Sequence, residues 1–160
     1  MRERHPRAGF IDLGASCQRG QQAVNNDEIE QRIRTAFGSD MEEFARLQLE
    51  MAADDMVQEW PQSGERIRGL DNIKAVGENY SASTGTSPKM TLRRILQPGK
   101  AWVIEGIIDY GDGVPVSAVS IVETDDEGKI THQTDYFASP FEAPEWRKRW
   151  VEHAEPMKVG

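Results

Sequence analysis

A chain of 160 residues is long enough to bury one hydrophobic core and too short for two independent domains joined by a linker. Its 27 acidic residues outnumber 19 basic residues, and the net charge of −8 argues against nucleic-acid binding, which depends on clustered Lys and Arg. With one cysteine and three scattered histidines, the sequence offers no disulfide and no metal-ligand spacing, so we expect neither metal nor cofactor. No apolar run reaches the length of a membrane span and no signal peptide is recognised, so a cytoplasmic location is expected.

The chain divides into an extension, a domain and a short tail. Residues 1–24 have no helical or strand period, so they are expected to be a disordered or loosely attached extension, with no role for His5 or Cys17. We expect a single domain over residues 25–155 and a tail over residues 156–160.

Three helices are predicted in the first half of the domain. Apolar spacing predicts the first from Asn26, with Gly38 ending it, and Ser39 with Glu42 has the spacing of a capping box that starts the second. Asp71 is suited to cap a third helix. The residues expected to face inward are Ile29, Ile33, Ala36 and Phe37, then Phe44, Leu47 or Gln48 and Met51, then Ile73, Val76 and Tyr80.

The remaining elements are extended. Turn residues separate the short apolar runs, which predicts a hairpin between the second and third helices and a four-strand antiparallel meander after the third. This order favours an α+β fold, in which a strongly curved sheet wraps around the helices. A short closing helix is expected around Trp146 and Trp150. The expected strands are 56–61 and 65–69 in the hairpin, and 89–97, 100–110, 114–124 and 129–138 in the meander.

Three segments resemble the nuclear transport factor 2 (NTF2)-like superfamily, and within it the SnoaL-like branch. They are "ADDMVQEWPQSGERIRGLDNI" at 53–73, "GKITHQTDYFA" at 128–138 and "PFEAPEWRKRW" at 140–150, and the resemblance covers about residues 26–153. It implies a conical partial barrel of antiparallel strands with a pocket between sheet and helices, usually in a dimer. The superfamily contains isomerases, cyclases, epoxide hydrolases, dehydratases and proteins with no known catalysis, so the resemblance is specific for fold and weak for function.

The resemblance assigns a role to Asp135 in the last strand. In the limonene epoxide hydrolase branch, the Asp of "DYF" points into the cone and acts on a water molecule. Strand alternation would send Gln133, Asp135 and Phe137 inward together. A carboxylate among apolar side chains is costly to keep charged, so Asp135 must either be protonated or find hydrogen-bond donors.

Departures from the hydrolase pattern weaken that activity. The Arg and the second Asp that support the hydrolase's catalytic Asp match Gly106 and Ile108 here, and its inward Tyr and Asn match Val57 and Glu59. In the ketosteroid isomerase branch, an inward acid on the early strand is the general base, and Glu59 is near that position. Epoxide hydrolysis is therefore disfavoured relative to proton-transfer chemistry.

The resulting hypothesis pairs Glu59 with Asp135 as catalytic residues. Two carboxyl groups in one apolar pocket cannot both ionise cheaply, so the pair could divide acid and base roles. The protein would then be a cofactor-independent isomerase, cyclase or lyase acting on a small hydrophobic carbonyl compound. In the alternative, Glu59 faces solvent, Asp135 only bonds a backbone group or a Trp, and the cone is a binding or assembly module.

Further residues complete the expected pocket and a dimer interface. The candidate ligand-binding residues are Val57, Tyr80, Trp102, Tyr110, Ser120, Gln133 and Phe137; for Trp102 and Tyr110 the alternative is ordinary core packing. Arg94 either points inward or, as we prefer, lies on the surface beside Arg93. Apolar residues also line the outer sheet face, which favours a homodimer through Val103, Ile107, Val119 and Ile121.

Overall fold

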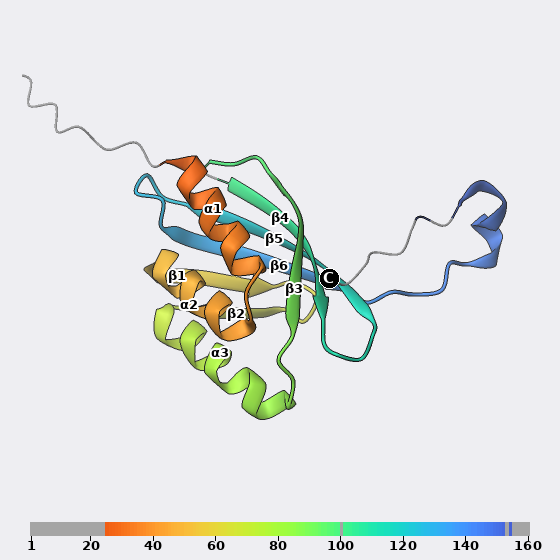
Figure 1. Ribbon diagram of the computed structural model, residues 1–160, viewed down its shortest axis with the longest axis horizontal. Helices are drawn as coiled ribbons and strands as arrows, with labels where there is room; N and C mark the ends of the chain where they lie inside the picture. The colour runs from red at the N-terminus through yellow and green to blue at the C-terminus, as the bar shows by residue number, and fades with distance from the viewer. Residues whose placement is uncertain (1–24, 100, 153, 155–160) are drawn as a thin grey trace, which may run out of the picture.

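The computed structural model describes residues 25–99, 101–152 and 154, and shows helices packed on one face of a six-stranded sheet (Figure 1). The helices are α1 (Asn26–Phe37), α2 (Met41–Met51) and α3 (Leu70–Thr84), followed late in the chain by the 3-10 helix η1 (Glu145–Trp150). The strands are β1 (Ala52–Trp60), β2 (Glu65–Arg68), β3 (Lys89–Leu96), β4 (Ala101–Asp109), β5 (Pro115–Thr124) and β6 (Ile130–Ala138). The expected extension over residues 1–24 and tail over residues 156–160 lie outside the described residues.

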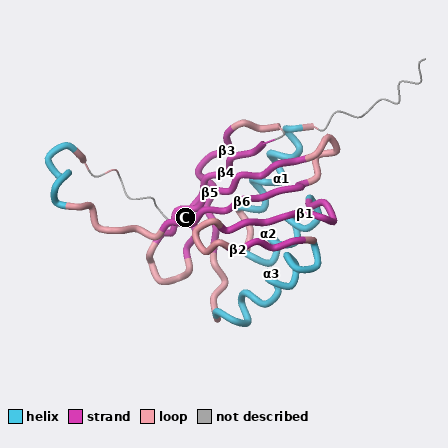
Figure 2. The backbone as a smooth tube through the Cα atoms, turned by 180° about the vertical axis from the view of Figure 1, so that it is seen from behind, coloured by secondary structure: helices cyan, strands magenta, loops and turns pink. Residues whose placement is uncertain are grey.

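The strand order is β2-β1-β6-β5-β4-β3, and the sheet does not close (Figure 2). The β1–β2 hairpin and the β3–β6 meander are antiparallel, as expected, and the α+β cone fold is confirmed. The sequence did not indicate how these two units join. β1 pairs in parallel with β6, which places the start of the hairpin beside the last strand of the meander.

Caps and buried faces set the positions of the helices. α1 begins after Asn25, whose side chain accepts a hydrogen bond from the backbone of Asp27, and it ends at Gly38 as expected. The expected capping box of α2 is wrong by one residue, because Asp40 is the cap and accepts from the Glu43 N–H at 2.9 Å. The buried core joins α1, α2 and α3 to the sheet through Ile29, Ile33, Phe37, Met51, Ala52, Met56, Ile73, Trp102, Ile104, Val122 and Ile130. In α3, the expected inward position of Val76 is wrong, since its side chain is 40% exposed.

A bulge in β3 settles the position of Arg94. The β3–β4 register shifts between Leu92 and Arg94, so one extra residue is accommodated and the inward face continues at Ile95. Arg93 and Arg94 both pair with Glu105 on β4, and Arg94 is exposed. Arg94 therefore lies on the surface, as preferred from the sequence.

The outer sheet face and the segment after β6 carry the remaining apolar groups. Val103, Val119 and Ile121 are half-buried, whereas Ile107 is already buried within one chain. The segment with η1 lies apart from the sheet and helices in both views (Figures 1 and 2), and Trp146 is 73% exposed. The expectation that this helix closes the cone is therefore wrong. No helix in the described part of the chain is long and apolar enough to cross a membrane.

Candidate functional site

Asp135 lies near the middle of β6, on the face of the sheet that the helices cover. Strand alternation places Gln133 and Asp135 on this face, with 5% and 3% exposure, and His132 and Thr134 on the other face. Phe137, two residues further along, is at the end of the strand and is exposed. The inner face of β6 is therefore polar at its centre, which is unusual for a buried sheet surface.

Four neutral side chains donate hydrogen bonds to the Asp135 carboxylate. Oδ1 accepts from Ser120 Oγ at 2.5 Å and from Gln133 Nε2 at 2.9 Å. Oδ2 accepts from Gln58 Nε2 at 2.7 Å and from Trp60 Nε1 at 3.3 Å. None of the cationic side chains in the described residues forms an ion pair with Asp135. The donors therefore hold the carboxyl group of Asp135 without a counter-ion.

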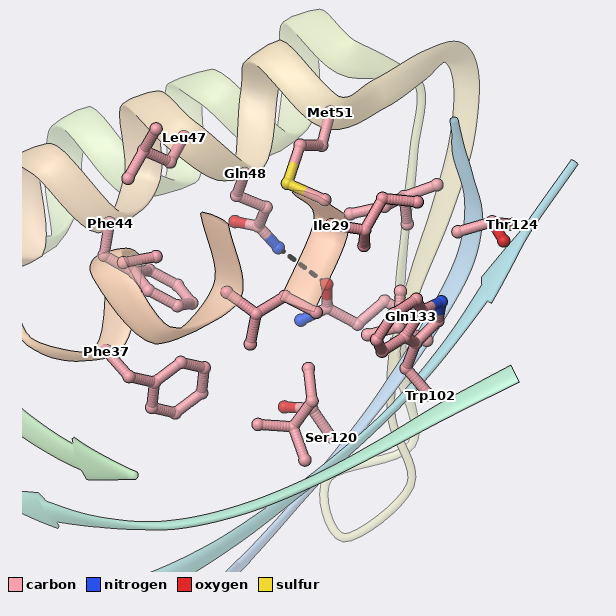
Figure 3. Close-up of a pocket in the computed structure, with 15 residues that line it drawn as sticks. Ile29, Phe37, Phe44, Leu47, Gln48, Met51, Trp102, Ser120, Thr124 and Gln133 are labelled. Carbon is pink, nitrogen blue, oxygen red and sulfur yellow. Dashed lines mark hydrogen bonds between the residues drawn. The ribbon is translucent and has the colours of Figure 1, made fainter. Parts of the chain in front are cut away.

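A chain of hydrogen bonds connects this carboxylate to α2. Gln48 Nε2 donates to Gln133 Oε1 at 2.9 Å (Figure 3), and Gln133 Nε2 in turn donates to Asp135. Because Asp135 fixes the direction of the Gln133 amide, it also determines which atom Gln133 offers to Gln48. The Asp135 carboxylate thus orients the Gln133 amide on β6 and, through it, the Gln48 amide on α2.

A small cavity lies between these polar groups and the helices. Its volume is about 50 Å³, enough for a few water molecules, since one water needs about 10–15 Å³. Most of its lining is aliphatic or aromatic side chains from α1, α2 and the sheet (Figure 3), and its polar lining residues are Gln48, Ser120, Thr124 and Gln133. Asp135 does not line the cavity and lies behind Ser120 and Gln133.

The structure does not bring Glu59 and Asp135 together. The inner face of β1 carries Met56, Gln58 and Trp60, so Glu59 is on the opposite face, where it pairs with Arg66 and lies 3.3 Å from His132 Nε2. The hydrogen bond from Arg66 is the largest of the causes that hold the pKa of Glu59 below its usual range. The expected inward positions of Val57 and Glu59 are wrong, because a shift of one residue reverses every side chain in a strand.

Sequence reasoning missed Gln58 and did not assign Gln48 or Trp60 to the site, although Trp60 was a candidate to close the mouth of the pocket. A signal for two of them was present in β1. Met56 and Trp60 are large apolar residues four positions apart, so they share a strand face, and Gln58 lies between them on that face. Gln48 was only an alternative to Leu47 on the inner side of α2; in the structure Leu47 is buried and both line the cavity.

Among the other expected ligand-binding residues, Trp102, Ser120 and Gln133 line the cavity. Tyr80 and Tyr110 do not, although they contact each other across α3 and the end of β4. Burial, and secondly the neighbouring hydroxyl of Tyr80, raises the pKa of Tyr110 to about 12. Val57 faces away from the cavity, on the side of the sheet that carries Glu59.

At Gly106, where the resemblance places one of the hydrolase's supporting side chains, the structure leaves little room for a side chain. A Cβ atom at this position would lie 2.9 Å from the backbone oxygen of Thr91 and 3.2 Å from the ring of Phe37. The Phe37 ring therefore occupies the space where a longer side chain would project. Ile108 is buried. The described residues also contain no cluster of three His, Cys, Asp or Glu side chains placed to hold a metal.

Comparison with solved structures gives the family. An NTF2-like protein of unknown function from Burkholderia xenovorans is 35% identical, with a TM-score of 0.64 over 81% of this chain and 95% of that one. The chain belongs to the NTF2-like family. No family model and no curated protein matches the chain.

Two solved structures of lower identity share the fold. A protein of Kribbella flavida, provisionally assigned as a ketosteroid isomerase, is 20% identical, with a TM-score of 0.68 over 84% of this chain and 93% of that one. A SnoaL-like protein of unknown function from Burkholderia thailandensis is 11% identical, with a TM-score of 0.57 over 73% and 99% of the two chains. At these identities the likeness establishes the fold alone.

Proposed function

We propose that this NTF2-like chain binds a small, neutral, largely apolar molecule in the cavity beneath α1 and α2. The observation that carries the proposal is the composition of the cavity wall, which is apolar except for four polar residues, two of them held directly by Asp135. Such a wall excludes water from most of a ligand and fixes its orientation through a few polar contacts. In this proposal Asp135 is a positioning residue for Ser120 and Gln133.

The geometry favours binding over the acid–base pair expected from the sequence. A general base must reach the proton that it removes, but Asp135 is behind the cavity wall and both of its oxygens already accept hydrogen bonds. Glu59, the expected partner, faces the other side of the sheet. These positions support a role for Asp135 in orienting the side chains of Ser120 and Gln133 that line the cavity.

The proposal is tested by filling the cavity. Ala36 on α1 lines it, so Ala36→Leu is expected to occupy part of its volume, whereas Ala75→Leu adds the same groups to an exposed site on α3. Binding of neutral ketones, esters and aromatic compounds of increasing size is measured by NMR titration of the labelled chain. We expect Ala36→Leu alone to weaken binding at least about tenfold, the loss expected from a steric conflict of more than about 1.4 kcal/mol. Equal binding by both variants would contradict the proposal.

A second candidate function is proton transfer through Ser120. Ser120 lines the cavity and its hydroxyl lies 2.5 Å from Asp135 Oδ1, so the hydroxyl could accept a substrate proton while passing its own to the carboxylate. The neighbour provisionally assigned as a ketosteroid isomerase makes this class worth testing. Exchange of α-hydrogens of ketones for deuterium should then be faster with the wild type than with Asp135→Asn. Equal exchange rates leave binding as the function.

We also propose that two copies associate through the outer face of the meander. Val103, Val119 and Ile121 lie on adjacent paired strands and are half-buried in one chain, and a second copy would cover them. Ile121→Lys is expected to reduce the mass measured by light scattering to that of one chain. The control Val114→Lys changes an exposed residue in the β4–β5 turn and should leave the mass unchanged. A wild-type protein with the mass of one chain would contradict this interface.

A further inference from the structure

The indole N–H of Trp102 is buried and has no hydrogen-bond partner. Trp102 is on the inner face of β4, is 0% exposed and lines the cavity. Its Nε1 is the buried side-chain polar atom left without a partner in the described part of the chain. Burial of an unpaired donor costs about as much as a lost hydrogen bond, so native proteins rarely leave such a group unsatisfied.

The unpaired N–H is separate from the network around Asp135. Figure 3 shows the indole nitrogen on the edge of the ring that faces Thr124, away from the hydrogen bond between Gln48 and Gln133. Thr124 does not accept from it, and its own hydroxyl donates to the Gly99 carbonyl at 3.2 Å. The cavity thus has one side on which Gln48 and Gln133 are joined by a hydrogen bond, and a buried donor without a partner at Trp102.

The lining restricts what this donor can bind. None of the fifteen described lining residues is charged, so a carboxylate or phosphate would be buried without a counter-ion. An indole N–H donates and cannot accept, so its partner must supply a lone pair. A neutral carbonyl oxygen meets both conditions, because it accepts strongly and its carbon substituents suit the apolar wall.

We propose that Trp102 Nε1 anchors a neutral carbonyl oxygen of the ligand, which makes Trp102 the residue that selects carbonyl compounds over hydrocarbons of the same shape. This inference rests on the proposed binding function, because it needs a ligand in the cavity. A water molecule bonded to Trp102 is the competing occupant, and the cavity volume of about 50 Å³ would admit one. The ligand's oxygen must therefore displace or replace that water.

The test compares acetone with isobutene, which share a shape but differ in one oxygen. Both are titrated into the nitrogen-labelled full chain, whose four tryptophans each contribute one indole N–H signal. We expect acetone to move the Trp102 indole proton downfield and to bind about threefold to tenfold more tightly than isobutene, the range expected for one hydrogen bond. Trp102→Phe should lose this preference for acetone, whereas Trp146→Phe, which alters an exposed tryptophan, should keep it.

The outcomes separate this inference from the function on which it rests. Equal binding of both probes with an unmoved Trp102 signal would overturn the carbonyl anchor and leave a binding cavity. Absence of binding by either probe would overturn both. If Trp102→Phe does not fold, the shift of the wild-type Trp102 signal, assigned by triple-resonance spectra, decides the question without the variant.

Discussion

Ser120 and Asp135 are directly opposed in the β5–β6 ladder, and the serine hydroxyl lies 2.5 Å from Oδ1 of the carboxylate. The other oxygen accepts from Gln58 and Trp60 on β1. One carboxylate therefore links three adjacent strands, including the parallel β1–β6 pair, whose register is irregular between Ala52 and Val57. Asp135 thus stabilises the join between hairpin and meander as well as the cavity wall.

Asp135→Asn is expected to destabilise the fold. The asparagine amide places an N–H₂ group against donors that require an acceptor, and each buried donor left unpaired costs about 1–3 kcal/mol. We expect a loss of about 3 kcal/mol in the free energy of unfolding, measured by urea denaturation. Asp55→Asn makes the same chemical change at an exposed position of β1 and should alter stability by no more than about 0.5 kcal/mol. Equal losses of unfolding free energy in the two variants would show that the stability of the fold does not depend on the hydrogen bonds to Asp135.

The fold could be predicted from the sequence because its signals are local. Helical spacing in α1 and turn residues between the meander strands do not depend on distant contacts. The site could not be predicted in the same way. It depends on which face of β1 is buried, and on a parallel pairing of β1 with β6. The residues that this pairing brings together are about 75 positions apart, as in the contact between Trp60 and Asp135. The bulge after Leu92 likewise changes the alternation of β3 without any proline or glycine to mark it.

We expect Glu59 to have no part in ligand binding, and we expect its pKa to depend on Arg66. Arg66→Gln removes the largest cause of its lowered pKa, so the pKa of Glu59 should rise toward 4.5, though His132 still favours the charged form. The pKa of Glu59 is lower in the folded chain than in the unfolded chain, so ionisation of Glu59 stabilises the fold. This stabilisation is fully present above the pKa of the unfolded chain and is lost as pH falls through the pKa of the folded chain. Carboxyl NMR titration of Glu59 measures the shift. Glu59→Gln should leave cavity binding unchanged, and weaker binding would restore the acid pair as a hypothesis.

The pKa of Tyr110 should fall when the Tyr80 hydroxyl is removed. Its pKa is raised to about 12, mainly by burial and also by Tyr80, so Tyr80→Phe should lower the pKa while leaving it above 10.0. A raised folded-state pKa gives stability that is present below the unfolded value and is lost as pH rises through the folded value, here between about 10 and 12. Carbon NMR of the labelled Tyr110 ring follows the titration. An unchanged pKa in Tyr80→Phe would mean that burial alone is responsible.

Gly106→Ala tests whether the approach of Phe37 to β4 requires the absence of a side chain. The added Cβ would lie 2.9 Å from the Thr91 oxygen, and this backbone atom cannot retreat without disturbing the ladder in which Gly106 pairs with Leu92. Overpacking of this kind costs about 1–3 kcal/mol, so we expect a loss in that range by urea denaturation. Gly38→Ala is the matched control, because its Cβ would have ordinary contacts at 3.5 and 3.6 Å and its φ of −92° suits alanine. If Gly106→Ala is as stable as Gly38→Ala, β3 can move away from β4 at this point, and the inner face has room for a side chain there.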